Sequence, residues 1–273
     1  MQTDHKGGDM DMLVTFGSLA VGGYLWYNWY QAVWADQLHR IRSNPAIVYL
    51  QLVPVFCATI IGYVLLLYSA SDVRSDIYYI FEYLVLGIAW VAVAEWLFRY
   101  MGISAIFDVV ERRNLAALIA VAGGLIGVAC CYSGGNIGEG PGAEVVFFSA
   151  GLVTLIYFFL WWLFSVVTRV DITITCDRDI ASGVRLGGFL AAAGLILGRA
   201  AAGNWVSYSA TVIDIALYGS PVLILWAAAV IIERRLQPAN DHSIPSPIKY
   251  SALSAVFYIV CAAAYILLTR FPS

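Results

Sequence analysis

The sequence predicts an all-α protein, a bundle of about eight transmembrane helices in a single membrane domain that takes up residues 1–273. Composition is the first observation, because 61% of the residues are hydrophobic and only 12% are charged, which is unlike a soluble domain of this length. The second is a succession of apolar stretches of about 20 residues, the length that crosses a bilayer as a helix. The third is the alternation of basic residues between successive loops, which is typical of a multi-pass membrane protein.

Residues 1–76 are expected to form an N-terminal helix pair, with spans over about residues 12–34 and 46–70. The second half of the first span is rich in tryptophan and tyrosine, which is typical of the place where a helix meets the membrane interface. The second span contains Pro54, which predicts a kink because proline removes one backbone hydrogen bond of a helix.

Residues 77–205 are expected to form a core of four spans, over about residues 77–100, 114–133, 143–168 and 180–203. The second and fourth of these spans follow short charged loops and are rich in glycine and alanine. Between the second and third spans lies the segment GGNIGEGPGAE. It lacks the lysine and the spacing of a phosphate-binding loop, so we predict a flexible turn there.

Small residues recur along one face of the span over residues 180–203 and form two G-x-x-x-G spacings. In lipid, such a stripe lets the backbone of another helix approach closely. The span over residues 114–133 has a similar stripe, in which Gly127 stands 67 residues before Gly194. We therefore predict a parallel internal repeat of residues 77–135 and 143–203. The glycines expected at helix contacts are Gly124, Gly127, Gly183, Gly187, Gly194 and Gly198.

Two motifs in this core also indicate a family. A charged loop followed by N-x-A-A and a G-x-x-G helix gives Asn114, Ala116, Ala117, Gly124 and Gly127, and a second version gives Asp179, Ala181, Gly183, Gly194 and Gly198. In this pattern, which covers about residues 77–205, the chain resembles a bacterial inner-membrane family catalogued as domain of unknown function 350, with YjfL-like proteins as members. The resemblance implies an envelope protein with two such repeats and implies no established chemistry.

Residues 206–273 are expected to add a C-terminal helix pair, with spans over about residues 211–232 and 249–268. Pro221 lies within the first of these spans, and a polar, proline-rich loop joins the two.

Basic residues orient the chain. One set of loops, those that lead from odd-numbered to even-numbered spans, holds Arg40, Arg42, Arg112, Arg113, Arg169, Arg178, Arg234, Arg235 and Lys249. The opposite set holds only Lys6, Arg74 and Arg270. Because cytoplasmic loops of membrane proteins carry the excess of lysine and arginine, the first set is predicted to be cytoplasmic. Both termini are then expected on the outer side of a bacterial inner membrane.

Four charged residues are expected at similar depth near the outer face: Arg199, Asp214, Glu82 and Glu144. A charge at membrane depth is costly and usually faces protein or water. One interpretation is an ion pair between Arg199 and Asp214 that fixes helix packing, with the two glutamates at the wet surface. The other is a binding site or vestibule for cations that is formed by all four residues.

A smaller charged set is expected toward the cytoplasm. Glu95 and Arg99 are four residues apart and can pair along one helix. Arg185 lies about one turn inside its span, and we expect its side chain to extend to the interface.

No sequence motif indicates catalysis. The three histidines lie in tails or loops, and the patterns HExxH and GxSxG are absent, so we predict neither an enzyme nor a metal or cofactor site. A basic stripe for nucleic acid is also absent. We expect a non-enzymatic protein of the lipid bilayer, a channel or carrier for a small cation such as a polyamine. The alternative is an envelope-stress or scaffold protein that forms a homo-oligomer, or binds envelope partners, through its glycine-rich helices.

Overall fold

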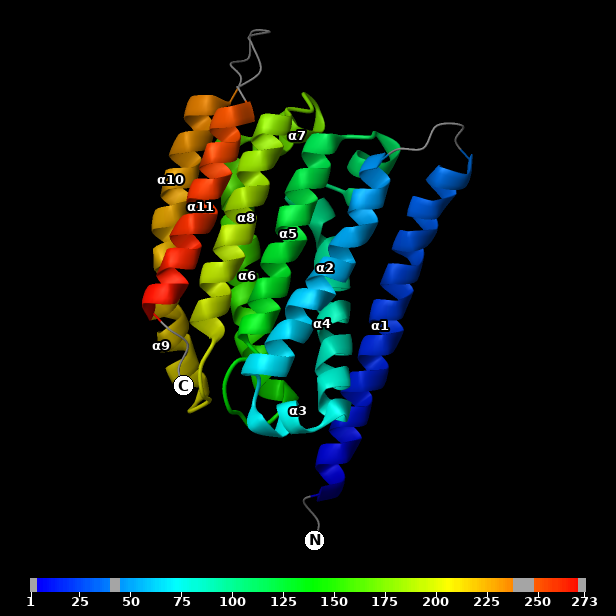
Figure 1. Cartoon of the computed structure of the whole chain (residues 1–273), viewed down its shortest axis with the longest axis vertical. Helices are drawn as coiled ribbons and strands as arrows, with labels where there is room; N and C mark the ends of the chain where they lie inside the picture. Colours follow the sequence, from blue (N-terminus) through cyan, green and yellow to red (C-terminus); the bar gives the residue numbers. More distant parts are fainter. Residues whose placement is uncertain (1–3, 40–44, 238–247, 270–273) are drawn as a thin grey trace.

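The computed structural model describes residues 4–39, 45–237 and 248–269, and the regular secondary structure in these ranges is helical throughout. The helices are α1 (Asp4–His39), α2 (Pro45–Tyr68), α3 (Ser71–Ser75), α4 (Ile77–Phe98), η1 (Arg99–Met101), η2 (Ala105–Glu111), α5 (Leu115–Gly134), α6 (Ala143–Thr168), α7 (Val170–Thr175), α8 (Ile180–Ala201), α9 (Tyr208–Gly219), α10 (Pro221–Leu236) and α11 (Ile248–Thr269). The long helices lie side by side along the long axis of the molecule, so the prediction of an all-α transmembrane bundle is confirmed (Figure 1).

Seven stretches of the described chain are long and apolar enough to cross a membrane, namely Val48–Tyr68, Ile77–Met101, Leu115–Gly134, Ala143–Thr168, Ile180–Ala201, Tyr208–Leu236 and Ile248–Thr269. The eighth expected span, residues 12–34, lies inside α1. The tyrosines, tryptophans and glycines of α1 make it less apolar than the other long helices. It nevertheless runs along one flank of the bundle, beside α4 (Figure 1).

The direction of the chain alternates from one long helix to the next, and α1 begins at the same end of the bundle at which α11 finishes (Figure 1). The span expected over residues 211–232 is broken into α9 and α10 at Ser220. Pro221 starts α10, where a proline is tolerated because the first turn of a helix has no backbone acceptor for its N–H. Proline does not divide α2, which continues through Pro54.

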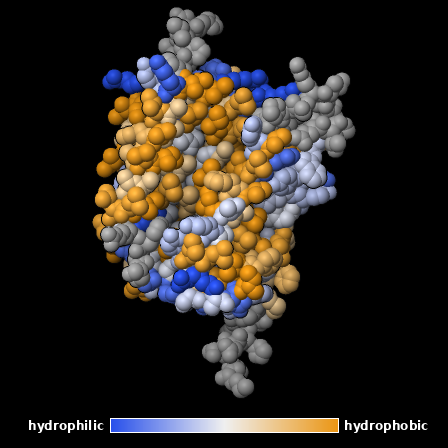
Figure 2. Space-filling model, viewed as in Figure 1, coloured by the Kyte–Doolittle hydropathy of each residue, from blue (hydrophilic) through white to orange (hydrophobic). Residues whose placement is uncertain are grey.

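Hydrophobic side chains cover the flank of the molecule, whereas hydrophilic side chains gather toward its two ends (Figure 2). Burial separates central from peripheral helices. In an apolar 18-residue window of each helix, 72% and 78% of the residues are buried in α5 and α8, against 22% in α2 and 17% in α11. The glycine-rich helices therefore form the centre of the bundle, as expected for helices whose small residues must face protein rather than lipid.

The glycines explain how α5 and α8 pack. The two helices run in the same direction and are in contact along their length (Figure 1). A side chain added to Gly194 would overlap the backbone of Gly127, and one added to Gly198 would overlap the carbonyl oxygen of Cys130. The glycines on this seam from the predicted set are Gly127, Gly183, Gly187, Gly194 and Gly198. The sixth, Gly124, faces the rings of Phe98 and Trp161 instead.

The helices α5 and α8 also begin in the same way. Arg113 and Arg178 have positive φ angles of 53° and 57°. The next residue in each case, Asn114 or Asp179, caps the helix by accepting hydrogen bonds from the backbone N–H groups two and three positions on. These equivalent starts lie 65 residues apart, whereas the pattern of small residues predicts an offset of 67. The internal repeat stays a prediction, and the matched starts support it.

Candidate functional site

The predicted ion pair between Arg199 and Asp214 is not formed. Arg199 is 5% exposed, donates a hydrogen bond of 3.1 Å to the carbonyl oxygen of Thr269, and has its guanidinium 4.9 Å from the centre of the Tyr218 ring. Asp214 is exposed and forms no ion pair with any residue that the structure describes. The reason is the register of α9, which turns Ile215 and Gly219 toward α8 and places Asp214 on another face.

The two glutamates of the predicted outer layer also lie apart. Glu82 is buried in α4, with 1% of its surface exposed, whereas Glu144 is exposed in the first turn of α6. None of the four predicted binding residues lines the pocket that the described chain forms at this end of the bundle. However, Tyr83 and Val145, which directly follow the two glutamates, both line this pocket.

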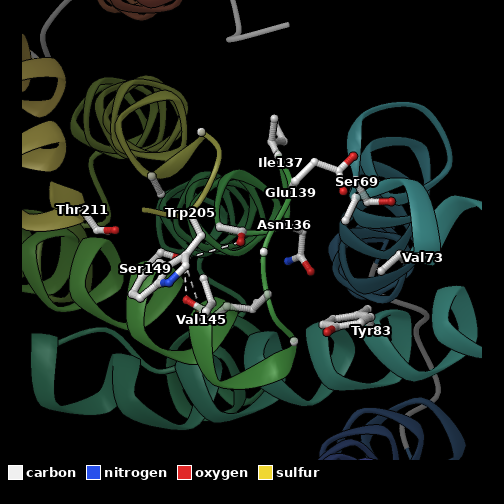
Figure 3. Close-up of a pocket in the computed structure, with 18 of the residues that line it drawn as sticks. Ser69, Val73, Tyr83, Asn136, Ile137, Glu139, Val145, Ser149, Trp205 and Thr211 are labelled. Carbon is white, nitrogen blue, oxygen red and sulfur yellow. Dashed lines mark hydrogen bonds between the residues drawn. The ribbon is translucent and has the colours of Figure 1, made fainter. Parts of the chain in front are cut away.

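This pocket has a volume of about 60 Å³, which is room for a small ion and a few water molecules (Figure 3). It lies where the segment after α5 meets the end of α2, the short helix α3 and the first turns of α6. The lining residues with polar side chains are Ser69, Asp72, Tyr83, Asn136, Glu139, Ser149, Trp205 and Thr211, and no lysine, arginine or histidine of the described chain is among them. We call it the loop-end pocket.

Backbone hydrogen bonds hold the loop that forms the pocket. Within the segment from Gly135 to Gly142, the carbonyl oxygens of Ile137 and Glu139 accept hydrogen bonds of 3.0 and 2.7 Å from the N–H groups of Gly203 and Trp205. The side chain of Asn204 accepts one of 2.9 Å from the N–H of Glu139. The loop after α5 is therefore tied to the loop after α8 by hydrogen bonds, whereas the flexibility expected for this turn stays a prediction.

Gly138 is needed at its position in this loop. Its φ angle of 110° is one that glycine adopts without strain, and a Cβ there would overlap the carbonyl oxygen of Gly203. The sequence feature that looked like a sign of flexibility therefore allows two loops to approach each other.

Asn136 is the most enclosed polar side chain of the loop itself, with 6% of its surface exposed. Its amide nitrogen donates a hydrogen bond of 2.8 Å to the carbonyl oxygen of Tyr132. Its amide oxygen accepts no hydrogen bond from any residue in the described ranges. The side chain points from the loop toward Ser69, Val73 and Tyr83 (Figure 3). This oxygen is not among the fully buried, unpaired polar atoms of the described residues, so it keeps contact with solvent and can bind water or an ion.

The two carboxylates of the pocket are exposed. Glu139 accepts hydrogen bonds of 3.0 and 3.2 Å from the N–H and hydroxyl groups of Ser71, and Asp72 accepts one of 2.8 Å from the N–H of Val73. An ionised carboxylate with one or two donors on it keeps further lone pairs for a cation. Within the described residues, no group of three or more histidine, cysteine, aspartate or glutamate side chains could hold a metal ion.

A second charged cluster lies near the opposite end of the bundle. Arg185 of α8 is 1% exposed and donates from Nε to Glu233 of α10 at 2.5 Å. Its other nitrogens donate to the hydroxyl groups of Ser251 at 2.6 Å and Ser182 at 2.8 Å. Asp179, the cap of α8, accepts a hydrogen bond of 2.8 Å from Ser182. The cluster joins α8, α10 and α11 inside the protein.

The expectation that Arg185 extends to the interface is therefore wrong. The expected pair of Glu95 and Arg99 is also absent from the ion pairs of the described chain, because Arg99 donates to the carbonyl oxygen of Trp96 and lies over its ring. The signal that could have revealed the partner of Arg185 is Glu233, which directly follows the predicted span over residues 211–232. Its helix continues to Leu236, so Glu233 lies inside the bundle rather than in a loop.

No family model matches this chain, and no match was found among the curated proteins or the solved structures compared with it.

Proposed function

We propose that this protein is a non-enzymatic, multi-pass protein of the bacterial inner membrane that binds a small inorganic cation in the loop-end pocket and serves as a channel or carrier for it. The observation that carries the proposal is the amide oxygen of Asn136, which belongs to a largely buried residue of the pocket lining and accepts no hydrogen bond within the described residues. A cation supplies the partner that such an oxygen lacks.

The chemistry of the lining favours a hard cation such as Na⁺, K⁺, Mg²⁺ or Ca²⁺. Amide, hydroxyl and carboxylate oxygens are the ligands that these ions prefer, whereas softer metals prefer sulfur and imidazole. The pocket volume of about 60 Å³ favours a compact inorganic ion over a polyamine with several methylene groups. Because Asp72 and Glu139 are exposed, we expect weak binding, with a Kd of about 10⁻⁴–10⁻³ M for Ca²⁺, as in extracellular calcium modules.

The surroundings of the pocket agree with an outward-facing site. The described basic residues of the loops predicted to be cytoplasmic, from Arg112 to Lys249, lie at the other end of the bundle, whereas Asp72, Asp76, Glu139 and Glu144 lie at the pocket end. We therefore propose that a cation enters from the outer side, where these carboxylates raise its local concentration.

The seam between α5 and α8 bears on the mode of transport. The backbones of the two helices are in contact at Gly127 and Gly194, which leaves no space for an ion between them. A cation carried past the pocket needs another route or a change of packing, so we favour a gated carrier over a permanently open pore.

The alternative role, a scaffold that assembles through its glycine-rich helices, has less support. The glycine faces of α5 and α8 pack against each other within one chain, so they are not accessible to a partner protein. The resemblance to the family of domain of unknown function 350 remains a proposal too, supported by the matched starts of α5 and α8.

Thermal unfolding of the purified protein in detergent, with and without 10 mM CaCl₂, MgCl₂, NaCl or KCl, tests the binding step. With a Kd of about 1 mM, 10 mM cation stabilises the folded state by about 1.4 kcal/mol. We expect Asn136→Ala and Glu139→Gln to reduce this stabilisation for the preferred cation. Asp214→Asn is the matched control, because it removes an exposed carboxylate that does not line the pocket. Equal stabilisation of all variants by every salt would contradict a site in the pocket.

A further inference from the structure

A groove lies between α10 and α11, far from the loop-end pocket. The two helices both pack against α8 and leave a hollow of about 560 Å³ between them. Its walls are mostly apolar and are formed by Ile231, Ile232, Leu236, Leu253 and Phe257. The groove belongs to the membrane-spanning segments Tyr208–Leu236 and Ile248–Thr269, so its apolar part faces the hydrocarbon layer.

Positive charge lies at the end of this groove. Arg235, in the last turn of α10, lines it together with Tyr250 of α11. Lys249 places its Nζ atom 5.0 Å from the centre of the Tyr250 ring. Both cationic side chains are exposed, and neither forms an ion pair within the described residues. Glu233, the acid in the same turn of α10, is buried and bound to Arg185.

We infer that this groove binds an anionic phospholipid. One acyl chain lies along the apolar wall, and the phosphate is held by Arg235 and Lys249 at the level of the headgroups. The occupant follows from the combination of an apolar groove with two cations at its mouth that form no ion pair within the described residues, because an anionic lipid is apolar along its tail and negative at its head. Basic side chains near a membrane surface attract anionic lipids in this way.

The neighbouring residue Arg234 provides a built-in comparison. It carries the same charge on the same turn of α10, but it donates a hydrogen bond of 3.0 Å to the carbonyl oxygen of Val167 and so faces α6. Loss of Arg234 changes the net charge of this end as much as loss of Arg235 does, without touching the groove.

Native mass spectrometry of the full chain in detergent, titrated with phosphatidylglycerol or phosphatidylcholine, tests the inference. We expect tighter binding of phosphatidylglycerol to the parent protein, about fivefold weaker binding in Arg235→Gln, and little change in Arg234→Gln. Ser254→Trp fills the groove without a change of charge and should reduce retention of both lipids. Thermal unfolding of each variant shows that it is folded.

Equal losses in Arg235→Gln and Arg234→Gln would overturn the inference, because they would indicate general attraction to a basic surface. Equal binding of both lipids by the parent would overturn it as well. If the groove instead seats a second copy of the chain, Ser254→Trp would lower the fraction of dimer and leave the lipid count unchanged.

Discussion

Gly194 of α8 packs so closely on the backbone of Gly127 of α5 that it has no room for a side chain, and a side chain on Gly127 would overlap Tyr157 and the carbonyl oxygen of Leu190. Contact of this kind brings two backbones together along the bundle axis, and in lipid it depends on small residues because no hydrophobic effect drives helices together there. The same arrangement at Gly183, Gly187 and Gly198 makes the α5–α8 pair the core on which the other helices pack.

Replacement of Gly194 by leucine should therefore prevent correct packing. The side chain would overlap the backbone of Gly127, which cannot move aside as a flexible side chain can, so we expect a cost above the roughly 1–3 kcal/mol that is typical of an overfilled core. The yield of monodisperse protein and its thermal unfolding temperature measure this. Ala216→Leu, on the exposed face of α9, is the control and should match the parent. Equal yields and unfolding temperatures of the two variants would show that the fold does not depend on close packing between α5 and α8.

The glycine stripe made this part of the fold predictable. Small residues at helical spacing in an apolar span have few uses other than close helix contact, so the sequence indicated both the helices and the faces that meet. The register was harder to predict, because a stripe of small residues matches itself at several offsets. The caps Asn114 and Asp179 lie 65 residues apart, whereas the contacts of Gly194 with Gly127 and of Gly183 with Ala116 keep the predicted offset of 67.

Removal of either partner of the buried pair Arg185 and Glu233 should destabilise the fold strongly. Arg185→Met or Glu233→Leu alone leaves one charge inside the bundle, and breaking such a pair costs about 3–5 kcal/mol. The double variant should cost less than the sum of the two, because no unpaired charge remains. A double-mutant cycle by thermal unfolding in detergent measures this. Additive costs would mean that the two residues do not act together.

Substitutions of Arg199 and Asp214, unlike those of Arg185 and Glu233, should have additive effects on stability. Asp214 is exposed and forms no ion pair in the described chain, so Asp214→Ala should leave stability within about 0.5 kcal/mol of the parent. Arg199→Ala removes a buried guanidinium from the face of Tyr218, a contact that contributes about 0.5–2 kcal/mol. The double variant should equal the sum of the two costs. A coupling energy above about 1 kcal/mol between the two substitutions would indicate that Arg199 and Asp214 form the ion pair that the sequence suggested.

The orientation of the bundle is open to a direct test. The loop after α5 and the end of α10 lie at opposite ends of the molecule (Figure 1). If the basic loops are cytoplasmic, a reporter fused at Asn136 should report an outer location and one fused at Gln237 an inner location. Signals from the same side for both fusions would contradict the arrangement.

The candidate site was less predictable than the fold. Sequence position indicated that Glu82 and Glu144 lie in one layer, but not which way each side chain points, since that depends on the rotation of each helix. The loop-end pocket also depends on hydrogen bonds between residues that are distant in sequence, such as Glu139 with Trp205. Asn136 stands out only once burial and its hydrogen bonds are known, because an asparagine in a glycine-rich loop is ordinarily a turn residue.

Cation flux into proteoliposomes tests the central claim most directly. Liposomes that contain the parent protein should take up the cation that stabilises it, at a rate above that of protein-free liposomes. Asn136→Ala and Glu139→Gln should reduce this uptake, whereas Asp214→Asn should leave it unchanged. Uptake at the level of protein-free liposomes for Na⁺, K⁺, Mg²⁺ and Ca²⁺ alike, or the same rate in all variants, would contradict a cation pathway through the loop-end pocket.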